Sequence, residues 1–348
     1  MARRLVLLIA AALLLGATGV TRAAGPGETV ATGIPYATNV VFDARGGMWV
    51  TSGAPFHESG DGVWYVATPG AKPVHVIRDT LLALGLTWYR GRLYVVSQVG
   101  GRAGVVDRYR GFDGRRFATH RRVVPLIPVY QHPLGTIVPG SQNRLYLGVG
   151  AEQDANAGGH VTSGTVVSFR GDGTDLRIEA RGVRGPFGLA FIPGTASLLV
   201  ADNGRDDLGA RRPPDELNLV RDVTRGAVDF GFPGCSNAGN SVCASTVRPL
   251  SLLRPHSAPG GVAVARNWRG RGLTAFVAEN GAVYPGVNAG RRITAVQLKR
   301  RAGGGYDTRK YTLAAGFADQ DPLGLAVGPD GGLYVTLFRT GGVVRFAG

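Results

Sequence analysis

One short phrase recurs six times along this chain, and it limits the possible fold more than any other feature. Each copy has a small or turn residue, a short apolar strand, a polar turn, and a second apolar strand with an aromatic residue or leucine at its centre. The alternation is that of β-strands, and no sustained helical stripe occurs beyond the first residues. The copies span residues 39–50, 84–95, 134–147, 187–200, 260–277 and 323–335.

The spacing of these copies predicts their arrangement. Their second strands end 45 to 77 residues apart, which leaves room for two further strands in each interval. Four strands per repeat at such a period is typical of a β-propeller. A β-sandwich would not require six similar hairpins, and a β-helix would have a much shorter period. We therefore expect an all-β, six-bladed propeller with four-stranded blades, closed where a strand near residues 28–32 meets one near residues 343–346.

The first residues have the layout of a secretory signal peptide. Arg3 and Arg4 precede an apolar run over residues 5–15, and small residues near Ala24 suit a cleavage site. The run is shorter than the roughly 20 apolar residues of a membrane-spanning helix, so no membrane span is expected. We interpret residues 1–24 as a cleaved signal peptide and residues 25–348 as one propeller domain. The mature protein is then exported, to the periplasm or the extracellular space.

The cysteines agree with an oxidising compartment. Only Cys235 and Cys243 occur, eight positions apart. A local disulfide is favoured over two free thiols, and in the chain-entropy model it stabilises the fold by about 2.5 kcal/mol. Two cysteines without clustered histidines do not indicate a structural zinc site.

The charge of the chain is high but dispersed. The formal net charge is +15, yet lysine occurs only at Lys72, Lys299 and Lys310, and the arginines are scattered without a basic helix or arm. Nucleic-acid proteins usually gather such charge on one face. We therefore expect no nucleic-acid partner, whereas adhesion to acidic surfaces is compatible with the composition.

The densest polar segment follows the fourth copy of the repeat. Residues 202–209 and 213–218 contain several carboxylates, glycine and proline directly after an apolar strand. Carboxylates in such a loop can bind a hard cation, and glycine lets backbone carbonyls join them. The same residue types are also the ordinary chemistry of a long solvated turn. The composition alone leaves both interpretations open.

Several segments of the chain resemble the soluble glucose and sorbosone dehydrogenase family. The resemblance extends from about Val40 to the C-terminus. It is most specific over residues 184–193, 202–209, 213–218, 229–235 and 256–259. It implies a six-bladed propeller that binds pyrroloquinoline quinone (PQQ) with Ca²⁺. Such a protein oxidises a sugar, sugar aldehyde or polyol by hydride transfer to the quinone, and an external electron acceptor completes the cycle.

The resemblance also implies roles for individual residues. His132 stands where the family places its catalytic base, although a histidine capping a loop beside Pro133 is the structural alternative. Arg184 matches a cofactor-binding arginine whose fork suits a carboxylate. Gly204 and Arg205 match the positions that offer main-chain carbonyls to Ca²⁺. The side chains expected either to shape the loop or to hold a second cation include Asp202, Asp215 and Glu216.

Other positions depart from the family pattern. Gly185 stands where the family has asparagine, Phe187 where glucose-oxidising members have glutamine, and Ala151 where they have aspartate. No lysine follows Asn280, where one branch has a cofactor-binding lysine, and Arg291 or Arg292 is the expected substitute. These departures keep two alternatives open: a propeller without cofactor that binds a carbohydrate or protein partner, and a calcium-dependent lactonase-like hydrolase.

Overall fold

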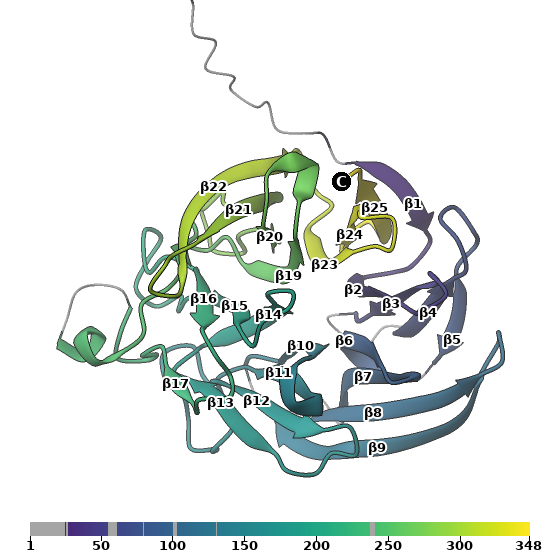
Figure 1. The fold of residues 1–348 in the computed structure, drawn as a ribbon, viewed down its shortest axis with the longest axis horizontal. Coiled ribbons are helices and arrows are strands. Elements are labelled where there is room, and N and C mark those ends of the chain that lie inside the picture. Colours follow the sequence, from purple (N-terminus) through teal and green to yellow (C-terminus); the bar gives the residue numbers. More distant parts are fainter. Residues whose placement is uncertain are drawn as a thin grey trace, which may run out of the picture.

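The computed structural model describes residues 25, 27–54, 61–78, 80–99, 103–129, 131–236 and 241–348. They form six β-sheets arranged as blades around a central axis (Figure 1), which confirms the predicted six-bladed propeller. The expected signal peptide lies outside the described residues. Within the described part of the chain, no helix has the length and apolar character needed to cross a membrane.

In each of the first three blades the strands follow one another outwards from the axis. Blade 1 contains β2 (Ala37–Phe42), β3 (Met48–Ser52), β4 (Gly62–Val66) and β5 (Val74–Ile77). Blade 2 contains β6 (Leu81–Tyr89), β7 (Arg92–Val99), β8 (Ala103–Phe112) and β9 (Phe117–Pro128). Blade 3 contains β10 (Leu134–Pro139), β11 (Arg144–Val149), β12 (Thr165–Arg170) and β13 (Arg177–Arg181).

The other blades repeat this pattern. Blade 4 contains β14 (Gly185–Phe191), β15 (Leu198–Asn203), β16 (Glu216–Val220) and β18 (Ser251–Leu252). Blade 5 contains β19 (Pro259–Ala265), β20 (Thr274–Glu279), β21 (Arg292–Arg300) and β22 (Tyr306–Ala315). Blade 6 contains β23 (Pro322–Val327), β24 (Leu333–Leu337), β25 (Gly342–Phe346) and, outermost, β1 (Glu28–Thr32).

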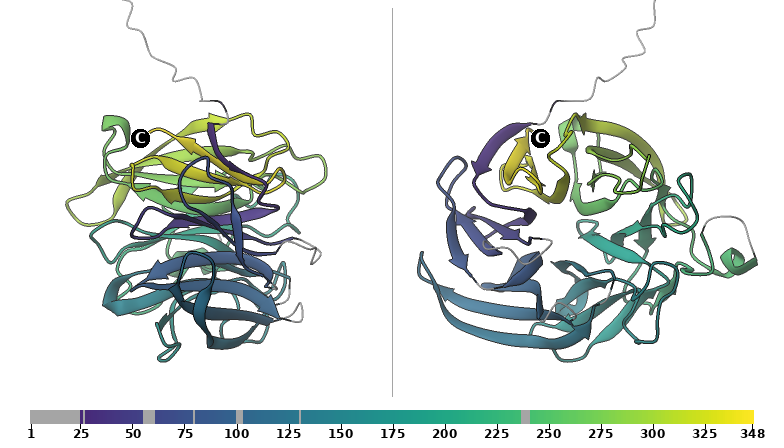
Figure 2. Two further views of the ribbon diagram at one scale, coloured as in Figure 1. Left: turned by 90° about the vertical axis from the view of Figure 1, so that its right-hand side faces the viewer. Right: turned by 180° about the vertical axis from the view of Figure 1, so that it is seen from behind.

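The ring closes as the sequence predicts. β1, from the N-terminal end of the domain, pairs antiparallel with β25 from the C-terminal end, with Glu28 opposite Arg345 and Thr32 opposite Gly342. Figure 2 shows the purple and yellow ends of the chain side by side in one blade. The pairing occupies the edge of β25 that would otherwise be open to other chains.

Glycine at the start of the innermost strands lets these strands pack closely around the axis. An added Cβ at Gly135 would lie 2.4 Å from the Phe187 carbonyl oxygen, and one at Gly188 would lie 2.1 Å from the Gly260 oxygen. Blade 1 alone has Asn39 at the corresponding position. The other glycines that meet a neighbouring innermost strand in this way are Gly85, Gly261 and Gly324.

The aromatic residues at the centre of the second strands fill the space between blades. Trp49 is fully buried between blades 1 and 2, where its ring contacts Tyr65, Trp88 and Phe112. Corresponding residues of other blades are equally buried, among them Tyr94, Tyr146 and Phe276. Each repeat therefore contributes half of an apolar interface that its neighbour completes.

The long fourth repeat contains two separate insertions. One is the acidic loop over residues 204–215, between β15 and β16. The other, residues 221–250, leaves blade 4 after β16, adds β17 (Val228–Asp229) parallel to β13 of blade 3, and projects at the periphery (Figures 1 and 2). It contains the expected disulfide between Cys235 and Cys243, which is confirmed.

Candidate active site

The face of the ring where the chain enters each innermost strand carries a polar cavity of about 210 Å³. The loop before β10 and the beginning of β14 form its walls, because these two innermost strands are neighbours around the axis. The lining residues are His132, Pro133, Arg184, Gly185, Phe187 and Asn203. Four of the six, namely His132, Arg184, Gly185 and Phe187, stand at positions that the resemblance assigns to the catalytic or cofactor-binding site.

His132 is a buried acceptor within this cavity. Its Nε2 is inaccessible to solvent and has no hydrogen-bond partner among the described residues. Burial lowers the pKa of His132 to about 4, and the Arg184 guanidinium acts in the same direction, whereas Asp154 and Asp206 oppose it. The imidazole is therefore uncharged at neutral pH, so one of its two ring nitrogens can accept a proton.

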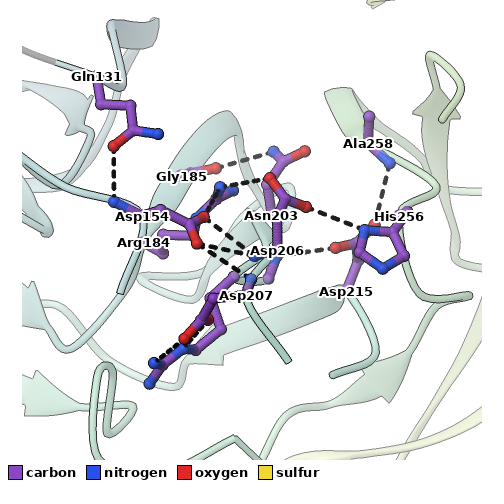
Figure 3. Close-up of polar contacts among 12 residues, drawn as sticks. Gln131, Asp154, Arg184, Gly185, Asn203, Asp206, Asp207, Asp215, His256 and Ala258 are labelled. Carbon is purple, nitrogen blue, oxygen red and sulfur yellow. Dashed lines mark hydrogen bonds and ion pairs between the residues drawn. The ribbon is translucent and has the colours of Figure 1, made fainter. Parts of the chain in front are cut away.

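Arg184 is held by two carboxylates (Figure 3). Its Nη2 donates to Asp154 and, at 2.9 Å, to Asp206 Oδ2. Asp154 also accepts hydrogen bonds from the backbone amides of Asp206 and Asp207, so it joins the loop of blade 3 to the acidic loop of blade 4. Arg184 Nε is buried without a partner among the described residues. The sequence analysis did not identify Asp154, since no motif surrounds it.

The carboxylates at the two ends of the acidic loop shape the backbone. Asp202 Oδ1 accepts from the backbone amides of Arg184 at 3.0 Å and Gly185 at 2.7 Å. Asp215 accepts from the Gly204 amide at 2.8 Å and from Ser257 Oγ at 3.0 Å. Burial raises the pKa of Asp215 to about 6 and also raises that of Asp202.

The expected side-chain cation site gains no support from these positions. Glu216 Oε2 accepts a hydrogen bond from Asn218, and Asp202 and Asp215 accept from the groups just described. Across the described ranges, no three histidine, cysteine, aspartate or glutamate side chains are grouped so that they could hold a metal ion. The geometry favours the loop-shaping alternative for these carboxylates.

Gly204 and Arg205 lie beside the main cavity and not within its walls. They border a small neighbouring cavity of about 30 Å³, which shares Arg184 and Asn203 with the larger one. The Arg205 side chain turns away, to Asp207 and to the Pro233 carbonyl at 3.0 Å. The disulfide-bonded insertion therefore contacts Arg205 and helps to form the wall of this small cavity.

The structure does not bring Arg291 and Arg292 to the cavity at His132. Arg291 pairs with Asp321 at 3.4 Å, and Arg292 forms an ion pair with the fully buried Glu279 at 2.8 Å. Neither arginine lines the cavity. At Gly185, an added Cβ would lie 3.1 Å from the Asn203 side chain, whose amide donates to the Gly185 and Pro259 carbonyls.

His256 supports the acidic loop from blade 5. Its Nδ1 lies 3.0 Å from Asp206 Oδ1, its Nε2 lies 3.2 Å from the Gly209 carbonyl, and its ring packs on Tyr284. Both ring nitrogens are engaged, so His256 positions Asp206 and is not available as a base.

Known proteins resemble this chain over most of its length. No family model matches the chain. An uncharacterized protein of Borreliella burgdorferi is 23% identical over 299 residues, which cover 78% of this chain and 75% of that protein.

Three solved structures share the architecture, all with less than 25% sequence identity. The PQQ domain of a pyranose dehydrogenase from Coprinopsis cinerea, in its holo form, has a TM-score of 0.72 at 16% identity, covering 90% of this chain and 93% of that one. A carbohydrate-active enzyme of family AA12 from Trichoderma reesei, described as a calcium structure, has 0.74 at 17%, covering 94% and 98%. The PQQ-bound aldose sugar dehydrogenase of Streptomyces coelicolor has 0.69 at 16%, covering 91% and 96%. The chain therefore has the six-bladed propeller fold seen in soluble PQQ-dependent sugar dehydrogenases.

Proposed function

We propose that this protein oxidises a hydroxyl group of a sugar, sugar aldehyde or polyol by hydride transfer to PQQ, with His132 as the general base. One observation carries the proposal: His132 offers a buried, unpartnered and uncharged Nε2 in a polar cavity on the axial face of the ring. The structural neighbours that bind PQQ and act on sugars support the choice of cofactor and substrate class.

The polar atoms around the cavity fit a quinone ligand. Nε2 of His132 and Nε of Arg184 are both buried without a partner among the described residues, and both side chains line the cavity. An oxygen-rich planar ligand would supply acceptors for the Arg184 donor, and Phe187 offers an aromatic face. When bound, PQQ accepts the hydride and Ca²⁺ polarises its oxygens as a Lewis acid. Main-chain carbonyls of Gly204 and Arg205 are the proposed Ca²⁺ ligands.

The chain's own residues have three tasks in this reaction. His132 accepts the substrate hydroxyl proton at Nε2 as the hydride leaves carbon, and its neutral state at pH 7 makes this possible. Asp154 and Asp206 hold the guanidinium of Arg184 in one orientation. Asp202, through the amides of Arg184 and Gly185, holds the backbone at the start of β14, so the cavity wall is rigid before ligands arrive.

The same proposal includes export. The confirmed disulfide agrees with an oxidising compartment, and the sequence has the layout of a signal peptide before the propeller. A periplasmic or extracellular enzyme would meet free sugars there and would pass electrons to an external acceptor.

Reconstitution tests the proposal directly. The purified protein, supplied with Ca²⁺ and PQQ, should bind the quinone at micromolar concentration and reduce an electron-accepting dye with members of a sugar and polyol panel. His132→Asn should retain quinone binding and lose at least about 100-fold in kcat, because general-base catalysis contributes about 10² to 10⁴. His120→Asn, at an exposed histidine outside the cavity, is the matched control.

Two results would overturn the proposal. If no quinone binds at micromolar concentration, the enzyme interpretation fails and the propeller without cofactor replaces it. If quinone binds and His132→Asn keeps full turnover, His132 is not the base. The lactonase-like alternative is less favoured, because the described residues that line the cavity include Asn203 but no carboxylate.

A further inference from the structure

The face opposite the His132 cavity carries a groove lined by arginines. It lies between blades 2 and 3, where the turns joining β6 to β7, β10 to β11 and β12 to β13 meet, and its volume is about 690 Å³. Six arginines and two aspartates line it, which leaves a net charge of +4 from those side chains. The charged residues are Arg90, Arg92, Arg108, Arg144, Arg170, Arg177, Asp172 and Asp175.

The carboxylates in the groove already interact with other groups of the protein. Asp175 pairs with Arg144 at 2.7 Å, Arg177 at 2.8 Å and Arg170 at 3.4 Å. The hydrogen bonds from Arg177 and Arg144 lower the pKa of Asp175 to about 2, so it stays ionised. Asp172 accepts from the amide and hydroxyl of Thr174. No carboxylate is paired with Arg90, Arg92 or Arg108 among the described residues.

Neighbouring groups hold two of these three guanidinium groups in place. Arg108 donates to the Gly171 carbonyl at 3.1 Å, and Arg90 donates to Asn143 Oδ1 at 2.6 Å. Arg144 is only 2% exposed and supports the floor through Ser168 Oγ at 2.8 Å. Guanidinium groups ordered in this way lose less entropy when they bind an oxyanion.

One tyrosine adds a surface that suits a sugar ring. Tyr89 lines the groove and is only half-buried, so part of its side chain is open to a ligand. Tyr94 is fully buried and donates its hydroxyl to the Gly171 carbonyl at 2.8 Å, so it holds the turn that also accepts from Arg108.

We propose that this groove binds the anionic groups of an acidic polysaccharide. Arginine forks match carboxylate and sulfate oxygens, and the accessible part of Tyr89 can contact a pyranose ring that carries them. A recessed groove of this kind admits a single flexible chain and suits it better than a flat membrane or the wide surface of a nucleic-acid duplex. The site is separate from the cavity at His132 and does not depend on the quinone proposal.

A second groove on the same face has a similar composition. It lies between blades 4 and 5, has a volume of about 1040 Å³, and has five arginines against one aspartate in its walls. A polysaccharide that spans several sugar units could therefore meet positive charge at more than one point of this face. The arginines are Arg221, Arg225, Arg248, Arg300 and Arg301.

Titration calorimetry on the whole protein tests the site with three defined polymers. Polygalacturonate presents carboxylates, dextran sulfate presents sulfates, and unmodified dextran presents neither. We expect binding to at least one charged polymer, weakening with added salt, and none to dextran. Arg90→Glu with Arg92→Glu should weaken this binding at least tenfold. Arg90→Ala with Arg92→Ala should weaken this binding less. The alanine variant replaces the charge-reversed variant in the test if the charge-reversed protein does not fold.

The matched control changes the net charge equally on the same face but outside the groove. Arg45→Glu with Arg115→Glu alters two exposed arginines in the turns β2–β3 and β8–β9, and binding should stay within twofold of the unchanged protein. Equal weakening by both charge-reversed pairs would overturn the proposal that this groove is the binding site, because the total charge of the protein would then explain binding. Tighter binding to duplex DNA or to anionic vesicles than to either charged polymer would also overturn it.

Discussion

At the scale of single residues, the site depends on how buried charges and acceptors are satisfied. Of the described residues that line the cavity, only His132 and Arg184 have a buried side-chain atom without a hydrogen-bond partner, Nε2 and Nε respectively. The remaining polar groups hold one another across blades 3, 4 and 5. Gly185 and Phe187, which depart from the family pattern, stand in the wall of the same cavity, so their effect is expected on which ligands bind there.

The low pKa of His132 predicts an unusual pH dependence. The folded-state pKa of His132, about 4, lies below the ordinary 6.5, so the imidazole stays neutral on acidification to well below pH 6. The kcat/KM profile should be flat from pH 7 to about 5 and fall towards pH 4. The unfolded chain binds this proton more tightly than the folded chain does. The contribution of His132 to the free energy of unfolding is therefore lost as pH falls from 6.5 towards 4. An acid limb centred near 6.5 would contradict this assignment.

The hydrogen bonds of Asp215 predict that this residue stabilises the fold and takes no part in proton transfer. Its carboxylate accepts hydrogen bonds from the amides of Gly204 and Ala258 and from Ser257 Oγ. Asp215→Ala leaves three donors without their acceptor, which should lower the free energy of unfolding by about 3 kcal/mol, measured in urea. Asp222→Ala, at a turn, should cost under about 1 kcal/mol.

At the scale of elements, the innermost strands owe their close packing to glycine. Their backbones approach so closely that a side chain in five of the six blades would collide with the next strand. The aromatic residue of each second strand then fills the wider space farther from the axis. The blade is thus narrow inside and broad outside, which suits a closed ring of six.

A single methyl group should therefore disturb the centre of the ring. Gly188→Ala places a Cβ 2.1 Å from the Gly260 carbonyl oxygen, and backbone cannot move aside as a flexible side chain does. We expect a loss of about 1 to 3 kcal/mol in unfolding free energy. Gly159→Ala, where no atom lies within 4 Å of the new Cβ, should change it by less than about 0.5 kcal/mol. Equal effects at the two positions would contradict the packing argument.

At the scale of the whole molecule, the two faces of the ring differ in charge. Near His132, the arginine is balanced by Asp154 and Asp206, whereas the opposite face has two grooves with a net charge of +4 each among their lining side chains. Much of the formal charge of the chain is thus placed away from the candidate active site. If both proposals hold, this separation would let a neutral sugar reach the cavity while an acidic polymer occupies the other face.

Closure of the ring should be essential to its stability. A chain that begins at Gly33 lacks β1 and leaves the edge of β25 without its partner strand. We expect a lower thermal midpoint and concentration-dependent association in size-exclusion chromatography. A chain that begins at Gly25 keeps β1 and should behave as the full domain. If both chains remain monomeric with equal thermal midpoints, the closing strand is not essential.

The sequence by itself determines the architecture of this protein. Six copies of one hairpin, each with an apolar strand pair and a closing aromatic or leucine, can bury their faces only against one another, and this local pattern repeats in every blade. The resemblance to the dehydrogenase family assigned His132, Arg184, Gly185 and Phe187 to one site, and the structure places them around one cavity. The disulfide and the closing strand were expected from the two cysteines and from the terminal strand patterns.

Only the tertiary structure decides how charges pair across blades. Asp154 meets Arg184 from 30 positions away, and Arg291 and Arg292 pair with Asp321 and Glu279 instead of lining the cavity. Scattered arginines likewise gather in grooves because turns from neighbouring blades come together on one face. The physical reason is that electrostatic partners depend on distance in space, whereas strand patterns depend on distance along the chain.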